Sequence, residues 1–138
     1  MESSQFLTFM LAGQEYGVDA LRVIEVINPV SVTSVPMSEP SIIGVMNFRG
    51  EVIPLVDLAC LIHFDSTVRN GKIIVVSHKG SMFGLLVDMV REIINPDSFI
   101  EASELGDVKL PFLQSVTQTQ NGLVRLLDVG AAIESLVK

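Results

Sequence analysis

The residues best suited to binding chemistry lie in the stretch Asn47–Leu58, which reads NFRGEVIPLVDL. Gly50 takes a positive φ at little steric cost and Asn47 can hydrogen-bond its own backbone, so the stretch is predicted to begin with a tight connection. The next apolar residues fall on both faces of an expected strand, which indicates a strand buried on both sides: Val52, Ile53, Leu55 and Val56. Arg49 is therefore expected at an exposed tip, where its planar guanidinium could bind a carboxylate through two hydrogen bonds.

A carboxylate interrupts a second apolar run, Val23–Ile27, which reads VIEVI. Strand alternation places Glu25 on one face with Val23 and Ile27. If those neighbours lie at the surface, the patch has the apolar centre and charged rim of a protein interface. Alternatively, Glu25 holds a backbone or arginine partner within its own part of the fold. The same two roles are open for Arg49, and we favour binding to a partner protein over an intramolecular salt bridge.

Catalytic constellations are missing from the sequence. The two histidines, His63 and His78, do not have the spacing of three or four residues at which two histidines on one helix share a metal ion, and both are expected at the surface or its boundary. No nucleophile elbow, phosphate-binding loop or dinucleotide-binding motif is present. Asp57 and Asp128 each precede a short apolar segment, so helix capping accounts for them. Cys60 is expected to be a small buried hydrophobic residue. We predict no enzymatic activity, cofactor or metal site.

The composition indicates a folded, acidic protein. Of 138 residues, 49% are hydrophobic and 18% are charged, which is more core material than a disordered chain carries. No apolar run approaches the roughly 18 residues of a membrane span, and no basic region followed by an apolar one marks a secretory signal, so a cytoplasmic protein is expected. The formal charge of −7 and the scattered lysines and arginines disfavour nucleic acid as a partner.

Most of the chain is predicted to be β-structure, because short apolar runs bounded by turn residues recur along it. The expected strands are Phe6–Leu11, Tyr16–Ala20, Val23–Ile27, Val32–Val35, Ile42–Met46, Val52–Val56, Lys72–Ser77, Phe83–Val87, Val90–Ile94, Phe112–Val116 and Gly122–Leu127. Two short helices, Leu58–Phe64 and Val129–Val137, are expected after the capping residues Asp57 and Asp128.

The two halves of the chain resemble each other. Phe6–Pro29 aligns with Ile73–Pro96 at a constant offset of 67 residues, and within it VIEVINP aligns with VREIINP, with five of seven residues identical. The later parts align at an offset of 71 residues, where Asn47–Gly50 falls on Gln118–Asn121. A residue kept at only one of two equivalent tips is a candidate for function, which again singles out Arg49.

Five short strands in each half are too few for two packed sheets and fit a small barrel, which has no free edge. We therefore predict a mostly β fold of two five-stranded barrel lobes, approximately residues 5–64 and 72–138, joined by a polar loop at 65–71. Each lobe alone is small, so the two are expected to share a hydrophobic seam formed by Val52–Val56 and Val124–Leu127. Terminal strands could exchange between the lobes.

Taken together, these features resemble the CheW family of chemotaxis coupling proteins, over nearly the whole chain. The matching segments are Phe6–Leu11, Glu15–Asp19, Val23–Ile27, Val35–Pro36, Ile43–Gly50, Val52–Leu58, Ile73–Val76, Gly84–Asp88 and Leu123–Asp128. The string I-x-G-x-x-N-x-R-G-x-x-x-P-x-x-D-L within Ile42–Leu58 is specific as a combination. Phe48 stands where the family more often has leucine, which keeps an apolar group beside Arg49.

The resemblance implies two SH3-like barrels and a non-catalytic adaptor, without a cofactor, that joins chemoreceptor cytoplasmic helices to the regulatory domain of a CheA-type histidine kinase. It implies receptor contact by Val23, Glu25, Asn47 and Arg49, and for the kinase it indicates only the outer barrel surface. It also implies a cytoplasmic protein that is recruited to membrane-associated receptor arrays without inserting into the membrane. Two alternatives stay open: an adaptor of a non-flagellar system such as twitching motility or biofilm formation, and a double barrel that binds a small ligand.

Overall fold

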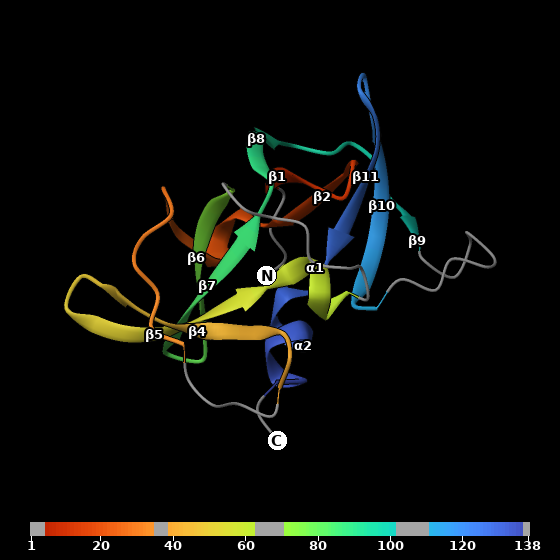
Figure 1. Ribbon diagram of the computed structural model, residues 1–138. Helices are drawn as coiled ribbons and strands as arrows, with labels where there is room; N and C mark the ends of the chain where they lie inside the picture. The colour runs from red at the N-terminus through yellow and green to blue at the C-terminus, as the bar shows by residue number, and fades with distance from the viewer. Residues whose placement is uncertain (1–4, 35–38, 63–70, 102–110, 137–138) are drawn as a thin grey trace.

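The computed structural model describes residues 5–34, 39–62, 71–101 and 111–136, which form a mostly β protein (Figure 1). The strands are β1 Phe6–Leu11, β2 Gln14–Asp19, β3 Val23–Ile27, β4 Ile42–Phe48, β5 Glu51–Asp57, β6 Lys72–His78, β7 Ser81–Val87, β8 Met89–Ile94, β9 Ile100–Glu101, β10 Leu113–Thr119 and β11 Gly122–Leu127. The helices are α1 Leu58–Leu61, α2 Val129–Glu134 and the single 3-10 turn η1 Ala20–Arg22. The predicted fold class is confirmed.

The strands form two sheets with the same plan (Figure 1). Sheet A has the order β8-β1-β2-β11-β10-β9, and sheet B has the order β3-β6-β7-β5-β4. In each sheet the pairing at the centre is parallel, between β2 and β11 in sheet A and between β5 and β7 in sheet B, whereas the other pairs are antiparallel. The shared plan makes the two sheets structural copies of one another.

The duplication in the sequence is also present in the strand register. Leu55 of β5 pairs with Gly84 of β7, and the equivalent residues Leu126 of β11 and Gly17 of β2 also pair. Each repeat, β1 to α1 or β6 to α2, therefore gives its first two strands to the sheet that holds the rest of the other repeat. The division into lobes 5–64 and 72–138 stays a prediction, but each sheet contains strands from both repeats.

One short segment links the opposite ends of each sheet. After β3, at one end of sheet B, Thr33 exchanges two backbone hydrogen bonds of 2.9 Å with Val45 of β4 at the other end. After β8, Ile100 of β9 pairs in the same way with Val116 of β10 in sheet A. The expected strand at Val32–Val35 is thus a single bridge, with Val35 itself outside the described residues. The two lobes fit the observed sheets, and full closure of each into a barrel stays a prediction.

The largest hydrophobic cluster joins the two sheets and both helices, and it forms the shared seam. Its fully buried members include Phe9, Val18, Val56, Ile74 and Val76. Two smaller clusters belong to single sheets, one around Met46, Ile53 and Leu55 in sheet B and one around Phe6, Val124 and Leu126 in sheet A. Burying apolar side chains from both repeats in one cluster stabilises the two sheets together.

The seam is not built as the sequence predicts. Of the two strands expected to form it, only Val56 and Leu127, near the ends that lead into the helices, join the shared cluster. Val52 is 69% exposed, because it lies one residue from the hairpin turn and faces solvent. The prediction that β5 is buried on both faces is therefore wrong next to the turn, at Val52, and correct further along the strand.

Both predicted helix caps are confirmed. Asp57 Oδ1 accepts a hydrogen bond of 3.2 Å from the Cys60 amide, and Asp128 Oδ1 accepts one of 3.0 Å from the Ala131 amide. The helices are shorter than predicted: α1 ends at Leu61, and α2 ends at Glu134. A tighter turn of the 3-10 type follows α2, in which the Leu136 amide donates to the carbonyl oxygen of Ile133, three residues earlier.

Two further predictions concern Cys60 and the histidines. Cys60 is partly exposed, not buried as predicted, and its Sγ atom accepts a hydrogen bond of 3.6 Å from the Ser41 hydroxyl. His78 lies at the boundary between core and solvent, whereas His63 is outside the described residues. Within the described ranges, no helix is long and apolar enough to cross a membrane.

Candidate protein-interaction site

The β4–β5 hairpin ends in a two-residue turn that holds Arg49. Arg49 has a φ of 50° and Gly50 a φ of 84°, and positive values at both central residues are typical of a type I′ turn. Asn47 Oδ1 accepts a hydrogen bond of 3.2 Å from the Gly50 amide, which secures the turn from the side. The tight connection predicted from the sequence is present.

Arginine is not the residue that this turn geometry selects. Asparagine, aspartate and glycine are preferred at the first central position of a type I′ turn, because a positive φ is costly for residues with longer side chains. Arg49 is nevertheless held at a φ of 50°. The β1–β2 and β6–β7 turns hold Ala12 and Lys79 at the same φ of 51°, so this kind of turn accepts several residue types and does not itself select arginine.

The Arg49 guanidinium is exposed but has a partner within the chain. Its Nη2 atom donates to Glu25 Oε1 of β3, and its Cζ atom lies 4.8 Å from the centroid of the buried Phe48 ring. The side chain is still 62% exposed, and that of Glu25 is 40% exposed. Among the described residues no second acceptor reaches the guanidinium, so most of its N–H groups face solvent.

The pairing of β3 with β6 is irregular next to Glu25. The register of the β3–β6 pair shifts between Val23 and Glu25, and such a bulge redirects the side chains next to it. The arginine partner considered for Glu25 in the sequence is therefore present. An exposed ion pair contributes only about 0–1 kcal/mol, so a carboxylate of another protein can compete for the same guanidinium. Partner binding by this pair stays a prediction.

The neighbours of Glu25 do not flank it at the surface. Val23 and Ile27 are half-buried and pack against the hydrophobic clusters, because their face of β3 points inward. Ile24 and Val26, on the opposite face, are each 37% exposed. Sequence reasoning missed these two as surface residues, although the apolar character of both faces of VIEVI was the available signal.

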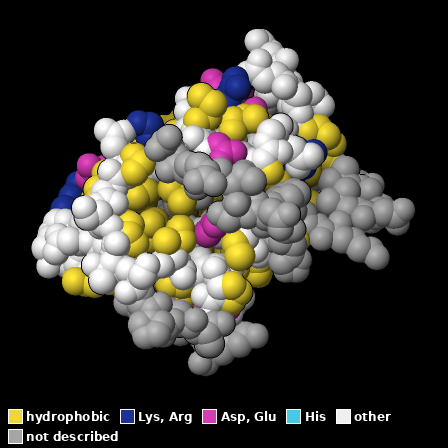
Figure 2. Space-filling model, viewed as in Figure 1, with side chains coloured by type: hydrophobic (Ala, Val, Ile, Leu, Met, Phe, Trp, Pro, Cys, Tyr) yellow, Lys and Arg dark blue, Asp and Glu magenta, His cyan; other side chains and the backbone are white. Residues whose placement is uncertain are grey.

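The structure places three of the four predicted receptor-contact residues at or next to the β4–β5 hairpin and turns the fourth, Val23, toward the core. It brings Glu25 and Arg49 into direct contact, and it places Asn47 on the same hairpin as Arg49. Val23 stands two residues before Glu25 with its side chain turned to the core. On the face shown in Figure 2, hydrophobic side chains gather toward the side of the β4–β5 hairpin, where basic and acidic groups lie next to one another.

Edge strands with exposed apolar side chains recur in both sheets. β3 at the end of sheet B exposes Ile24 and Val26, and β8 at the end of sheet A exposes Met89 and Ile93. Together with the charged tip at Arg49, they give the apolar and charged surface that protein interfaces use. Such surfaces are typical of protein-binding scaffolds.

Comparison with known proteins identifies the family. The sequence profile of the CheW-like domain matches residues 5–137, and the chain belongs to the CheW family of chemotaxis coupling proteins. The family predicted from the sequence is confirmed, and it is a scaffold family that is generally non-catalytic.

Relatives and a solved structure agree with this assignment. The chemotaxis protein CheW of Bacillus subtilis is 29% identical over 136 residues, which cover 94% of this chain and 86% of that protein. CheW of Helicobacter pylori is 30% identical over 95 residues, which cover 67% of this chain and 58% of that protein. The crystal structure of the scaffolding protein TtCheW from Thermoanaerobacter tengcongensis is similar with a TM-score of 0.84 and 27% identity, over 96% of this chain and 93% of that one.

Proposed function

We propose that this protein is a non-catalytic adaptor that couples the cytoplasmic tips of chemoreceptors to a CheA-type histidine kinase in a bacterial chemosensory array. The observation that carries the proposal is Arg49, an arginine held at positive φ in a turn that prefers asparagine or glycine. The equivalent residue of the second repeat is Gln120, so the duplicated fold does not require an arginine there. The charge at this one tip is best explained by a partner.

Each predicted contact residue has a physical role in this proposal. Arg49 offers its solvent-facing N–H groups to carboxylates on a receptor helix, and the planar guanidinium suits bidentate binding. Glu25 holds the guanidinium in place from one side, and Asn47 secures the turn. Val23 anchors the strand that carries Glu25 by packing against the shared core.

The assembly that follows from the proposal uses several modest interfaces. A receptor helix would dock by its regularly spaced anchors, and the kinase regulatory domain would bind a different part of the surface, on the outside of the lobes. Each contact needs no more than about 1,600 Å² of buried surface, because many contacts in one array raise the effective concentration. The adaptor would work in the cytoplasm, at arrays held on the membrane by the receptors.

The proposal is tested by titrating the full chain with a receptor cytoplasmic fragment and, separately, with a kinase regulatory domain, both from the same genome. Arg49→Glu is expected to weaken receptor binding about 10- to 100-fold, the loss that follows when a charged hydrogen-bonding group is removed. Kinase binding is expected to stay at the wild-type level. Equal loss of both affinities would show that Arg49 supports the fold instead.

Two further variants separate binding from the intramolecular ion pair. The double variant Glu25→Arg with Arg49→Glu keeps an ion pair between the same positions but reverses its direction, so receptor binding should stay weak. Recovery of receptor affinity in this variant would mean that Arg49 acts only through Glu25. Gln120→Glu, at the equivalent tip of the second repeat, is the matched control and should bind the receptor fragment like the wild type.

A further inference from the structure

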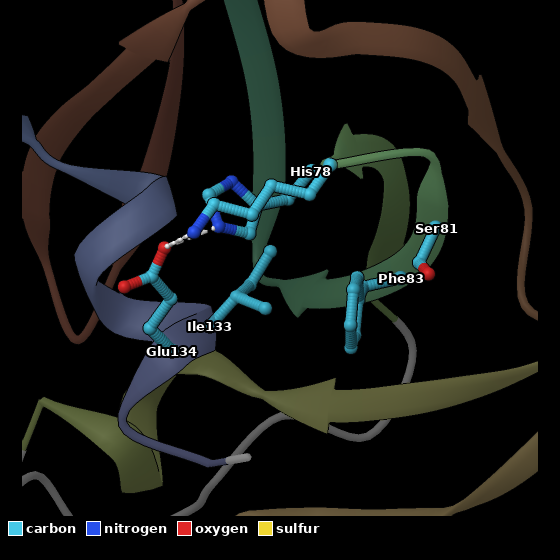
Figure 3. Close-up of a pocket in the computed structure, with 6 residues that line it drawn as sticks. His78, Ser81, Phe83, Ile133 and Glu134 are labelled. Carbon is cyan, nitrogen blue, oxygen red and sulfur yellow. Dashed lines mark hydrogen bonds and ion pairs between the residues drawn. The ribbon is translucent and has the colours of Figure 1, made fainter.

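A chain of polar contacts centred on His78 lies away from the Arg49 tip. His78 ends β6 with its side chain only 10% exposed. Its Nδ1 atom lies 3.0 Å from Arg22 Nη1 of η1, and its Nε2 atom lies 2.8 Å from Glu134 Oε2 of α2. Figure 3 shows the imidazole pointing toward Glu134, between α2 and the β6–β7 turn. The ring therefore contacts two elements other than its own.

The partners of the ring determine where its proton is. A guanidinium has five N–H donors and no acceptor, so Nδ1 must accept from Arg22 and carry no proton. Nε2 then carries the proton of a neutral imidazole and donates it to Glu134. The structure thus contains a directed series of hydrogen bonds from Arg22 through His78 to Glu134.

The charged groups around the ring come from three elements. Arg22 faces it from η1, Glu134 faces it from α2, and Lys79 follows it in its own turn, with Nζ 2.9 Å from Glu134 Oε2. The hydrogen bonds from Lys79 and then from His78 hold the pKa of Glu134 below its usual range, so the carboxylate is ionised near neutral pH. Packing is close on the α2 side, because a Cβ atom at Gly130 would lie 3.0 Å from the His78 ring.

The position of this series in the fold makes it a connection between the sheets. η1 carries the chain from β2 of sheet A to β3 of sheet B, and α2 follows β11 of sheet A, whereas β6 belongs to sheet B. A cavity of about 410 Å³ between α2 and the β6–β7 turn opens onto the site and is lined by His78, Lys79, Ser81, Phe83, Ile133 and Glu134 (Figure 3). Protons from solvent can therefore reach the ring.

The first repeat does not contain this arrangement. The residue equivalent to His78 is Leu11, which is completely buried, and the residue equivalent to Lys79 is Ala12. Met89 of the second repeat is the equivalent of Arg22. Leucine, alanine and methionine therefore stand where the second junction has histidine, lysine and arginine, so the duplicated fold does not by itself require these polar residues.

We propose that protonation of His78 controls a contact between the two sheets. The neutral ring connects η1 to α2, because it is hydrogen-bonded to Arg22 and to Glu134. A proton added to Nδ1 removes the acceptor and places two cations face to face, so the hydrogen bond to Arg22 breaks. The contact with Glu134 becomes a charge-assisted hydrogen bond and persists. Acidification therefore releases η1 but keeps α2 attached, and because η1 leads directly into β3, the release reaches the strand that carries Glu25.

The proposal is tested on the full chain alone by nitrogen NMR of the imidazole rings from about pH 8 to pH 5, the range in which histidine changes charge. At the upper end, His78 should have a protonated Nε2 and an unprotonated Nδ1. As Nδ1 gains its proton, the backbone amide signals of Ala20–Arg22 should shift in step, and those of Val129–Glu134 should shift much less. A protonated Nδ1 at pH 8, or η1 signals that ignore the titration of the ring, would overturn the proposal.

Variants identify the ring and its partner. His78→Gln should abolish the pH-dependent shifts in η1, and His63→Gln, at the other histidine of the chain, should leave them intact. Arg22→Gln replaces the cation with a group that can accept as well as donate, so the shifts in η1 should shrink. If His78→Gln does not fold, the comparison of Arg22→Gln with His63→Gln still tests the proposal, because unchanged η1 shifts in Arg22→Gln contradict it. No receptor or kinase is needed, so the outcome is independent of the proposed adaptor function.

Discussion

The two hairpin tips occupy equivalent places in the two sheets and use different turn chemistry. At the β4–β5 tip, Arg49 and Gly50 both have positive φ and the Asn47 side chain accepts from the turn. At the β10–β11 tip, Gly122 has a φ of 116°, and Thr119 Oγ1 donates to Gly122 O and accepts from the Asn121 amide. One sheet plan therefore accepts two turns, which leaves the turn residues free to serve binding.

A second difference between the repeats concerns the strands that carry these tips. Gly44 of β4 and Ser115 of β10 are equivalent residues, and both pair near the segment that links the ends of their sheet. A Cβ atom at Gly44 would lie 2.3 Å from the carbonyl oxygen of Thr33, which belongs to the linking segment. Sheet A holds the larger serine at this place, so the linking segment is packed more tightly in sheet B.

The largest effect is expected from Gly44→Ala. The new methyl group meets backbone atoms that no rotamer change can move, so the free energy of unfolding should fall by about 3 kcal/mol. Ser115→Ala, at the equivalent place, removes one hydroxyl and adds no atom, so the free energy of unfolding should fall by less than about 1.5 kcal/mol. Denaturant unfolding of both variants measures the difference. Similar losses in the two variants would contradict the unequal packing of the linking segments.

An effect of intermediate size is expected on the pKa of Tyr16. This residue of β2 is equivalent to Phe83 of β7. Tyr16 is completely buried, with the Arg125 Cζ atom 6.0 Å from its ring centroid, whereas Phe83 is partly exposed. Burial raises the pKa of Tyr16, and the charge of Arg125 lowers it by a smaller amount. Removing that charge in Arg125→Gln should therefore raise the pKa of Tyr16 further.

The direction of the pH effect follows from linkage. Because the pKa of Tyr16 is higher in the folded chain than in the unfolded one, its contribution to stability is complete below the unfolded value of about 10 and is lost as pH rises through the folded value. Tyr16 is the single tyrosine of the chain, so ultraviolet absorbance titration of folded and urea-unfolded protein reports it directly. Ionisation at the same pH in both states would show that burial does not act on the phenol.

The smallest effect is expected from Arg49→Asn. Asparagine suits the positive φ of the first tip, and this gain offsets the loss of the exposed ion pair with Glu25, so the free energy of unfolding should change by less than about 1 kcal/mol. Thermal unfolding compares this variant with Gln120→Asn at the second tip. A loss of about 3 kcal/mol in Arg49→Asn alone would mean that Arg49 stabilises the fold.

Features that depend on neighbouring residues could be predicted from the amino-acid sequence alone. The bounds of β1, β3 and β11, the caps at Asp57 and Asp128, and the exposed turn at Arg49 and Gly50 all follow from alternation, capping and turn preferences, which act within a few residues. The internal repeat was equally visible, because two copies of one pattern share the same local signals.

The way in which the two copies combine became visible only in the folded protein. The placement of β1 and β2 in sheet A and of β6 and β7 in sheet B, the exposure of Val52 and Ile24, and the contacts Arg49–Glu25 and Arg22–His78–Glu134 join segments far apart in the chain. Local preferences do not determine whether a strand pairs with strands of its own repeat or with strands of the other repeat. Burial of both repeats in one shared core makes that choice, and it sets which side chains remain at the surface.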